Sequence, residues 1–180
     1  FKCKKNGICS KDPVLNAIDA AITNEIKQIA FYVVKLNECN LRNENLMKEA
    51  VNALCVCISD VNFNESSLVN FYSKINNMKN KIREFYVEKS KEIKVPYEVS
   101  VENCDEEKIS NSISIIKKGE EIIKKFYNSI PLEKIRLINL IILICKTAAI
   151  NLSKLEFYKE INSNVRFEIL RLLSIISPTA

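Results

Sequence analysis

Glycine and proline are the residues that most often interrupt regular structure, and this chain of 180 residues has only two glycines and four prolines. Sandwiches, barrels and other multi-stranded sheets need many tight turns, and Gly-rich nucleotide-binding loops need several glycines. This scarcity argues against both classes and favours long helices with few connections. Hydrophobic residues make up 47% of the chain, which is enough for a folded core.

Apolar residues recur at intervals of three and four through the first half of the chain, which predicts three amphipathic helices. The first begins at Asp12, an N-cap residue followed by Pro13 at the first helical position. A polar loop at 37–43 precedes the second helix, and a turn at 62–64, capped by Asn64 or Ser66, precedes the third. The apolar positions are Leu15, Ile18, Ile22, Ile26, Ile29, Val33 and Leu36, then Met47, Val51, Leu54 and Ile58, then Leu68, Phe71, Ile75, Met78, Ile82 and Phe85.

The second half predicts three further helices after a stretch at 91–106 that contains Pro96 and has no helical pattern. Within this stretch, 95–99 could pair as a short strand. In the first of them Gly119 interrupts the apolar positions, which is typical of a place where another helix passes close. The helix that starts at Pro131 is apolar on most faces, so we expect it to be the central buried helix of its bundle. The run 162–164 marks a kink or break in the last helix. The apolar positions are Ile109, Ile113, Ile116, Ile123 and Phe126, then Ile135, Ile138, Ile142, Cys145 and Ala149, then Leu155, Tyr158, Ile161, Val165, Ile169, Leu172 and Ile176.

These patterns predict an all-α fold of six main helices arranged as two three-helix bundles with a short non-helical connector. We assign 1–90 to a cysteine-containing head and the first bundle, 91–107 to the connector, and 108–180 to the second bundle. Residues 53–63 and 142–152 resemble each other, and each precedes a helix with a Phe-Tyr pair. Duplication of a three-helix unit and chance similarity of amphipathic helices both explain this likeness.

Charge and residue usage exclude several functions. The 27 basic residues exceed the 22 acidic ones by only five and are scattered, so we expect no nucleic-acid partner. The longest apolar stretch, 137–152, contains Asn139, Lys146 and Thr147, so we also expect no membrane span. Histidine is absent, which excludes histidine-dependent triads and histidine metal sites. Neighbouring acids such as Glu120 and Glu121 point to different sides of a helix, so we expect no enzyme activity from the chain by itself.

Two groups stand out among the seven cysteines. An odd number of scattered thiols fits a reducing compartment, so we expect a cytoplasmic protein. Cys55, Cys57 and Cys145 lie within apolar helices, and we expect Cys55 and Cys145 to be buried and without a metal or disulfide partner. Cys3 and Cys9 instead lie in a polar, lysine-rich head just before a helix N-terminus, which lowers a thiol pKa and favours the thiolate. They are the candidate metal ligands, and a local disulfide between them is the alternative.

The head from Cys3 to Pro13 (CKKNGICSKDP) resembles the end of the N-terminal cluster motif of hybrid cluster proteins, also called hydroxylamine reductases. Cys3 and Cys9 match the last two of that motif's four cysteines. Gly7, Lys11 and Pro13 match the motif at the corresponding positions. The run 60–64 (DVNFN) resembles the turn that ends the family's second helix. The resemblance implies a domain of two three-helix bundles and an iron–sulfur cluster, such as a 4Fe-4S cluster, at Cys3 and Cys9. The family's catalytic domains and the first two cluster ligands have no counterpart here, so hydroxylamine reduction does not carry over.

The sequence thus predicts a small iron–sulfur, electron-transfer accessory module that resembles the N-terminal domain of hybrid cluster proteins. Two thiolates do not complete a cluster, so the missing pair is expected upstream of Phe1 or from a homodimer that shares the cluster. A protein or redox partner is expected in either case. The alternative is a non-catalytic helical protein–protein interaction module with no bound metal, in which Cys3 and Cys9 are spare thiols.

Overall fold

The computed structural model describes residues 12–56, 64–93, 111–156 and 163–176, and every regular element within these ranges is a helix. The predicted all-α fold is therefore confirmed. The six helices are α1 (Pro13–Glu38), α2 (Glu44–Val56), α3 (Glu65–Ile93), α4 (Ser112–Ser129), α5 (Leu132–Glu156) and α6 (Ser163–Ile175). The short strand that 95–99 could form, most of the predicted connector, and Cys3, Cys9, Cys57 and Cys104 lie outside the described residues.

Helix α1 begins where the sequence predicts. The Asp12 carboxylate accepts a hydrogen bond from the Val14 amide at 2.8 Å, and Pro13 takes the first helical position. At the other end Asn40 adopts a φ of 59°, a left-handed conformation that asparagine tolerates better than most residues. The Leu41 amide then donates to the Leu36 carbonyl at 2.9 Å and turns the chain toward α2. Local capping chemistry therefore fixes both ends of this helix.

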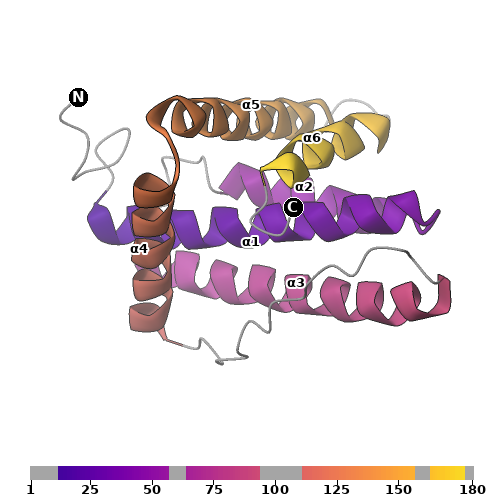
Figure 1. The fold of residues 1–180 in the computed structure, drawn as a ribbon, viewed down its shortest axis with the longest axis horizontal. Coiled ribbons are helices and arrows are strands. Elements are labelled where there is room, and N and C mark those ends of the chain that lie inside the picture. The colour runs from indigo at the N-terminus through magenta and orange to yellow at the C-terminus, as the bar shows by residue number, and fades with distance from the viewer. Residues whose placement is uncertain (1–11, 57–63, 94–110, 157–162, 177–180) are drawn as a thin grey trace.

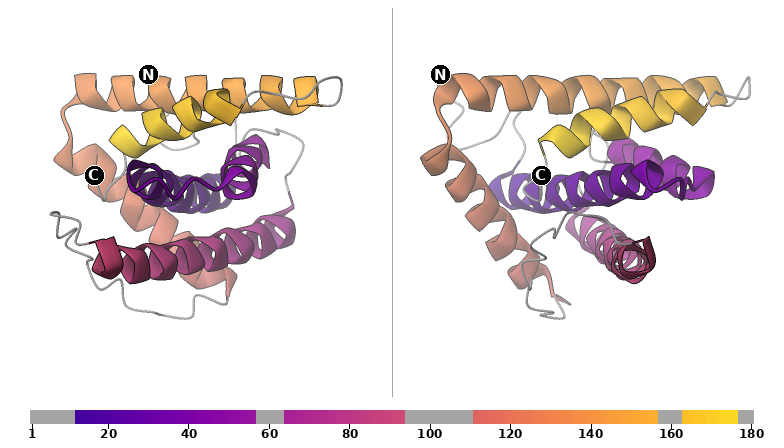
Figure 2. Two further views of the ribbon diagram at one scale, coloured as in Figure 1. Left: turned by 90° about the vertical axis from the view of Figure 1, so that its right-hand side faces the viewer. Right: turned by 45° about the vertical axis from the view of Figure 1, so that its right-hand side comes forward.

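The helices form layers around α1 (Figures 1 and 2). α5 and α6 lie on one side of α1 and α2, α3 lies on the other side, and α4 crosses α1 near its N-terminal end. α1 contacts α3, α4 and α6 most extensively, so it touches helices from both halves of the chain. The division into two three-helix bundles is compatible with these contacts and stays a prediction. The domain boundaries at 90 and 108 also stay predictions.

The helix after Pro131 is predicted to be the central buried helix of its bundle, but this prediction of burial is wrong. The most buried helix of the described fold is α1. α5 packs by one face only, through Ile135, Cys145, Ala149 and Leu152, while large apolar side chains on its opposite face are exposed. The apolar residues of α1 are instead buried along nearly its whole length: Ala17, Ile18, Ala21, Ile22, Ile26, Ile29, Ala30, Phe31, Tyr32, Val33 and Leu36. A pattern of apolar residues shows which faces of a helix are apolar, but it does not show which of these faces packs against another helix.

Two smaller expectations are also corrected. Leu155, assigned from the sequence to the last helix, lies in the final turn of α5, and the separate helix α6 begins at Ser163 within the run 162–164. Cys55 is half-buried rather than buried, because it lies at the edge of the core near the C-terminal end of α2. Cys145 is buried as predicted, and neither thiol is in a disulfide.

Asn64 caps α3, as one of the two candidates that the sequence predicts. Its side chain accepts a hydrogen bond from the Ser67 amide at 3.3 Å.

By length and composition alone, α5 is the helix within the described ranges that could cross a membrane. The expectation of no membrane span rested on three polar interruptions, which are too few to exclude this helix by those criteria. A single helix of this kind is weak evidence, because core helices also meet the criteria.

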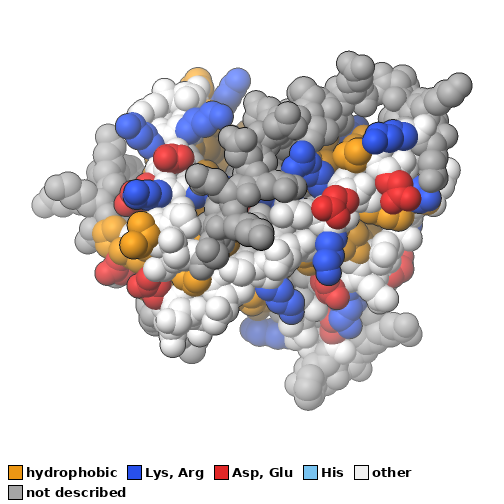
Figure 3. All heavy atoms as spheres, turned by 90° about the horizontal axis from the view of Figure 1, so that it is seen from below, with side chains coloured by type: hydrophobic (Ala, Val, Ile, Leu, Met, Phe, Trp, Pro, Cys, Tyr) orange, Lys and Arg blue, Asp and Glu red, His pale blue; other side chains and the backbone are white. Residues whose placement is uncertain are grey.

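The face that includes α3 carries charges of both signs. In Figure 3, lysine and arginine side chains lie among aspartate and glutamate side chains, and small apolar areas lie between them. Such mixing is typical of a solvated protein surface rather than of a nucleic-acid site, which needs a continuous basic stripe. The absence of a nucleic-acid partner stays a prediction.

Gly119 lies where α4 crosses α1, as its position in the sequence pattern suggests. A Cβ atom at this residue would lie 1.9 Å from the carbonyl oxygen of Ala17 and 2.4 Å from its carbonyl carbon. Both are backbone atoms, which do not move aside as a flexible side chain does. The absence of a side chain at Gly119 therefore sets how closely α4 approaches α1.

We predict that Gly119→Ala destabilises the protein. In an ordinary helix interior this change stabilises by about 0.5–1 kcal/mol. Here the new methyl group forces α4 away from α1, and we expect a net loss of about 2–3 kcal/mol in the free energy of unfolding. Urea denaturation followed by circular dichroism measures it, with Glu120→Ala at the exposed neighbouring position as the control. Equal or greater stability of Gly119→Ala would contradict the close crossing.

Candidate functional site

The candidate ligands Cys3 and Cys9 lie outside the described residues, but the helix end to which they lead is described. Only two residues separate Cys9 from the Asp12 cap in the sequence. The first turn of α1 contains no acidic side chain. Its free amides leave a partial positive charge at this end, which favours a nearby thiolate.

Two other helices hold this end of α1 in place. α4 crosses it at Ala17 through Gly119, and α5 reaches it through Lys146, whose Nζ lies 3.4 Å from Asp19 Oδ2. The Lys146 and Asp19 side chains are both largely buried, so this pair is less screened by water than a surface pair. The N-terminus of α1 is therefore a rigid platform for the segment that precedes it.

The three described cysteines do not offer an alternative cluster site. Cys145 is buried, donates to the Ile169 carbonyl at 3.7 Å, and has a pKa raised to about 11 by burial. Burial and the nearby Glu156 carboxylate also raise the pKa of Cys55. Thiols with raised pKa values stay protonated and are poor metal ligands. Within the described ranges, His, Cys, Asp and Glu side chains form no group of three that could hold a metal ion.

A buried charged centre lies deeper along α1, and the sequence analysis did not find it. Glu25 is fully buried, and its carboxylate meets two lysines from different helices. Lys118 Nζ of α4 lies 2.6 Å from Oε1, and Lys79 Nζ of α3 lies 2.7 Å from Oε2. The Lys79 contact is a close ion pair without the geometry of an aligned hydrogen bond. One carboxylate therefore links three helices.

Tyr72 of α3 completes this centre. Its hydroxyl accepts a hydrogen bond from Lys118 Nζ at 2.9 Å and donates a longer one to Glu25 Oε1 at 3.5 Å. Burial and the Glu25 charge raise the pKa of Tyr72. Burial by itself would lower the pKa of Lys118, but the Glu25 carboxylate and its hydrogen bond outweigh this effect and raise it. Tyr72 therefore stays neutral and Lys118 charged, as a structural ion pair requires.

A signal for this centre was present in the sequence. Glu25 lies three residues after Ile22 and four before Ile29, so it takes a position on the buried stripe of α1. A charged residue at such a position is rarely buried without a partner of opposite charge. The identities of its partners could not be found in this way, because α3 and α4 are remote in sequence.

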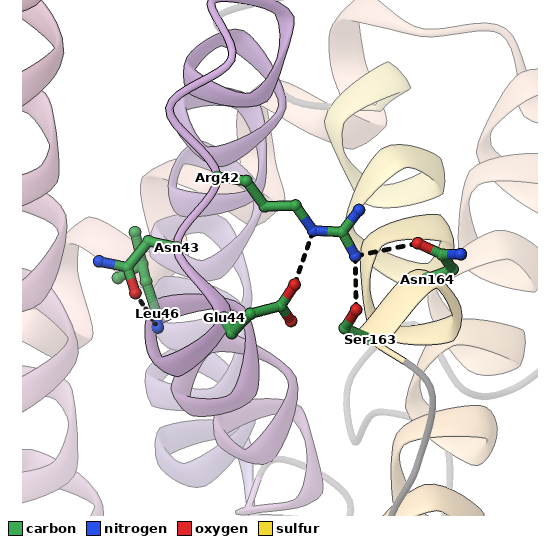
Figure 4. Close-up of polar contacts among 6 residues, drawn as sticks. All are labelled: Arg42, Asn43, Glu44, Leu46, Ser163 and Asn164. Atoms are coloured by element: carbon green, nitrogen blue, oxygen red, sulfur yellow. Dashed lines mark hydrogen bonds and ion pairs between the residues drawn. The ribbon is translucent and has the colours of Figure 1, made fainter.

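A second polar cluster joins the α1–α2 loop to the start of α6 (Figure 4). Arg42 donates through Nε to Glu44 at 2.7 Å, and its terminal nitrogen donates to Ser163 Oγ at 2.7 Å and Asn164 Oδ1 at 3.0 Å. The neighbouring Glu156 of α5 accepts from Arg166 of α6 and lies 3.3 Å from Lys48 of α2. These groups satisfy one another, so the cluster fixes helices rather than presenting a free reactive group.

Comparison with known proteins gives one similarity. The chain is 23% identical over 133 residues to a hydroxylamine reductase of Thermodesulfovibrio yellowstonii. The alignment covers 71% of this chain but only 23% of that protein, so the chain spans less than a quarter of its relative. No family model matches the chain, and no solved structure does. The similarity supports a distant relation to hydroxylamine reductases, in agreement with the resemblance of the Cys3–Pro13 head.

We predict that Glu25→Gln strongly destabilises the fold. The substitution keeps the size of the side chain but leaves Lys79, which is largely buried, without its counter-charge. Breaking a buried pair in this way costs about 3–5 kcal/mol. The free energy of unfolding from urea denaturation measures the loss. The control Glu25→Gln/Lys79→Met removes the unpaired charge and should recover part of it; no recovery would contradict the ion-pair explanation.

We also predict that Cys145 is the thiol most protected from alkylation. With its pKa at about 11 rather than 9.0, its thiolate fraction at neutral pH falls about 100-fold, and burial slows access further. Iodoacetamide labelling followed by peptide mass spectrometry should modify half-buried Cys39 in the folded protein and Cys145 only after denaturation. Equal labelling rates for Cys145 before and after denaturation would show that it is not part of the core.

Proposed function

We propose that this chain is a helical iron–sulfur module, distantly related to the N-terminal domain of hydroxylamine reductases, in which Cys3 and Cys9 ligate the cluster. The observation that carries the proposal is the similarity over 133 residues together with the matching cysteine head. When bound, such a cluster supplies one-electron transfer. The helices supply a rigid support for it, and hydroxylamine reduction is not part of the proposal.

The charge around Cys3 and Cys9 supports their role as ligands. Lys4, Lys5 and Lys11 offset the negative charge of a thiolate-ligated cluster, and the N-terminus of α1 adds its partial positive charge. Two of the three described thiols do not compete, because burial raises the pKa values of Cys55 and Cys145. Among the cysteines considered, Cys3 and Cys9 therefore have the chemistry best suited to a cluster.

Two thiolates leave the cluster half-ligated. The remaining ligands come from residues beyond this pair, either preceding them in a longer gene product or in a second protomer that shares the cluster as a homodimer. Electrons then pass to a redox partner protein. A cytoplasmic location fits this chemistry, because free thiols and oxygen-sensitive clusters persist in reducing compartments.

We predict that Cys3→Ser/Cys9→Ser loses bound iron and keeps the helical fold. Serine does not replace thiolate as a cluster ligand, and neither position belongs to the helical core positions predicted from the sequence. Iron content and visible absorption are measured after anaerobic purification and cluster reconstitution, with helicity from circular dichroism. Cys39→Ser is the matched control and should retain iron. Iron that persists in the double variant, or a colourless protein from the complete gene product with all its cysteines, would contradict the proposal.

A second candidate function has a specific observation in its favour. The exposed apolar face of α5 suits a helical protein–protein interaction module with no bound metal, in which Cys3 and Cys9 have no ligand role. Such a module remains colourless after anaerobic reconstitution, and its association with a partner is unaffected by Cys3→Ser/Cys9→Ser. The iron–sulfur proposal predicts the opposite for colour, so the same preparation separates the two.

A further inference from the structure

The outer face of α5 carries an apolar stripe that the described part of the chain leaves exposed. Its four side chains, Leu137, Leu140, Leu143 and Ile144, are each between 51% and 59% exposed. Spacings of three and four residues place them on one side of the helix, opposite the face that packs on α2 and α6. A stripe of this kind costs free energy in water and is typical of an interaction site.

The apolar composition of α5 is more than its place in the core requires. Core helices of soluble proteins reach the length and composition of a membrane span as α5 does, but they are mostly buried. Of the 18 residues that form the most apolar stretch of α5, only 28% are buried. Cys145 and Ala149 still pack in the core, and Lys146 is held against Asp19 of α1. α5 therefore stays on the domain and presents the rest of its apolar surface outward.

Exposed basic side chains lie at both ends of this face. Arg136 lies one turn before Leu140 and on the same side of the helix. Lys154 follows Arg136 after about five helical turns, so it shares that side at a distance of about 27 Å along the axis. Lys134 is also exposed at the first end. Within the described ranges none of these three basic side chains forms an ion pair with its own chain.

The acidic side chains at these ends do not cancel the basic ones. Exposed Glu133 is outnumbered by Lys134 and Arg136. At the other end Glu156 is already paired with Arg166 of α6. Long basic side chains can keep their methylene groups on an apolar surface while their charged ends reach anionic groups. An anionic lipid surface fits both parts of this face, with acyl chains for the stripe and phosphate-bearing headgroups for its ends.

We propose that the outer face of α5 binds a membrane surface that contains anionic lipids, with the helix lying in the plane of the membrane. The stripe from Leu137 to Ile144 enters the boundary between headgroups and acyl chains, and Arg136 and Lys154 contact lipid phosphates. α5 keeps its contacts with the other helices, so the arrangement needs no membrane span. The inference concerns a different part of the chain from the proposed cluster and does not depend on it.

A protein surface fits this face less well than lipid does. The buried centres of protein interfaces are enriched in aromatic residues and methionine, and the sequence of α5 contains neither. A second copy of the chain is also disfavoured, because each end of the face carries basic residues that would approach those of the copy. The charges and the aliphatic stripe therefore favour an anionic lipid surface.

The primary experiment measures binding of the full chain to vesicles by co-sedimentation. One set of vesicles is phosphatidylcholine alone, and the other is phosphatidylcholine mixed equally with phosphatidylglycerol. We expect the chain to bind the mixed vesicles at least about tenfold more tightly than phosphatidylcholine alone, and added salt to reduce this difference. No binding to the mixed vesicles, or equal binding to both sets, overturns the proposal.

Leu140→Asp tests the apolar stripe. A carboxylate at this position should weaken binding to the mixed vesicles by at least about tenfold, because the leucine no longer leaves water. Ile113→Asp is the matched control, since Ile113 is 63% exposed in the first turn of α4, at the end of that helix remote from α5 (Figure 1). Circular dichroism checks that both variants keep their helices. Undiminished binding by folded Leu140→Asp, or equal loss in the control, overturns the assigned face.

Arg136→Glu/Lys154→Glu tests the charged ends. Reversal of both charges should weaken binding to the mixed vesicles by at least about tenfold. The control Lys74→Glu/Lys81→Glu makes the same change in net charge at exposed positions of α3, on the other side of α1, and should alter binding by no more than about twofold. Equal loss in both double variants would show that net charge alone drives binding, and it overturns the assigned face.

Sedimentation equilibrium without lipid tests a second copy as the rival occupant. The unaltered chain and Leu140→Asp are compared over a micromolar concentration series. We expect no self-association that depends on Leu140. A dimer of the unaltered chain that Leu140→Asp dissociates overturns the proposal and assigns this face to self-association.

Discussion

Glu25 imposes the strongest constraint on this fold, because an ionised carboxylate in a protein core is stable only if opposite charges reach it. Its partners come from α3 and α4, so the chain must bring Lys79 and Lys118 to the same point on α1. Gly119, one residue from Lys118, lets the α4 backbone come close enough for this contact. The position of α4 across the N-terminal half of α1 follows from these two requirements together.

With α3 and α4 fixed in this way, α2 and α6 cover the remaining surface of α1, and α5 packs on α2 and α6. Polar links hold this second group: Lys146 meets Asp19, Arg42 meets the start of α6, and Glu156 meets Arg166. α5 therefore lies at the periphery with only one face covered. Its position leaves the apolar outer stripe in solvent, and its link to Asp19 steadies the end of α1 to which the cysteine head is attached.

The two proposals place function at different parts of this scaffold. The cysteine head precedes the N-terminus of α1, whereas the α5 face lies on the outer layer. Both use the helices as rigid supports rather than as a catalytic pocket. This fits a chain that aligns with less than a quarter of a hydroxylamine reductase.

The sequence by itself determined the helices, since their ends depend on local chemistry such as the Asp12–Pro13 cap and their apolar faces appear as a spacing of three and four. It also predicted the buried thiol of Cys145 and the close passage at Gly119. It did not determine which helix is central, because α1 and α5 are both rich in apolar residues. The burial of each depends on which other helices pack against its faces. The partners of Glu25 likewise became visible only in the tertiary structure, because Lys79 lies 54 positions and Lys118 lies 93 positions further along the chain. Local interactions follow from neighbouring residues, whereas the choice of a central helix and its ion pairs depends on contacts between segments remote in sequence.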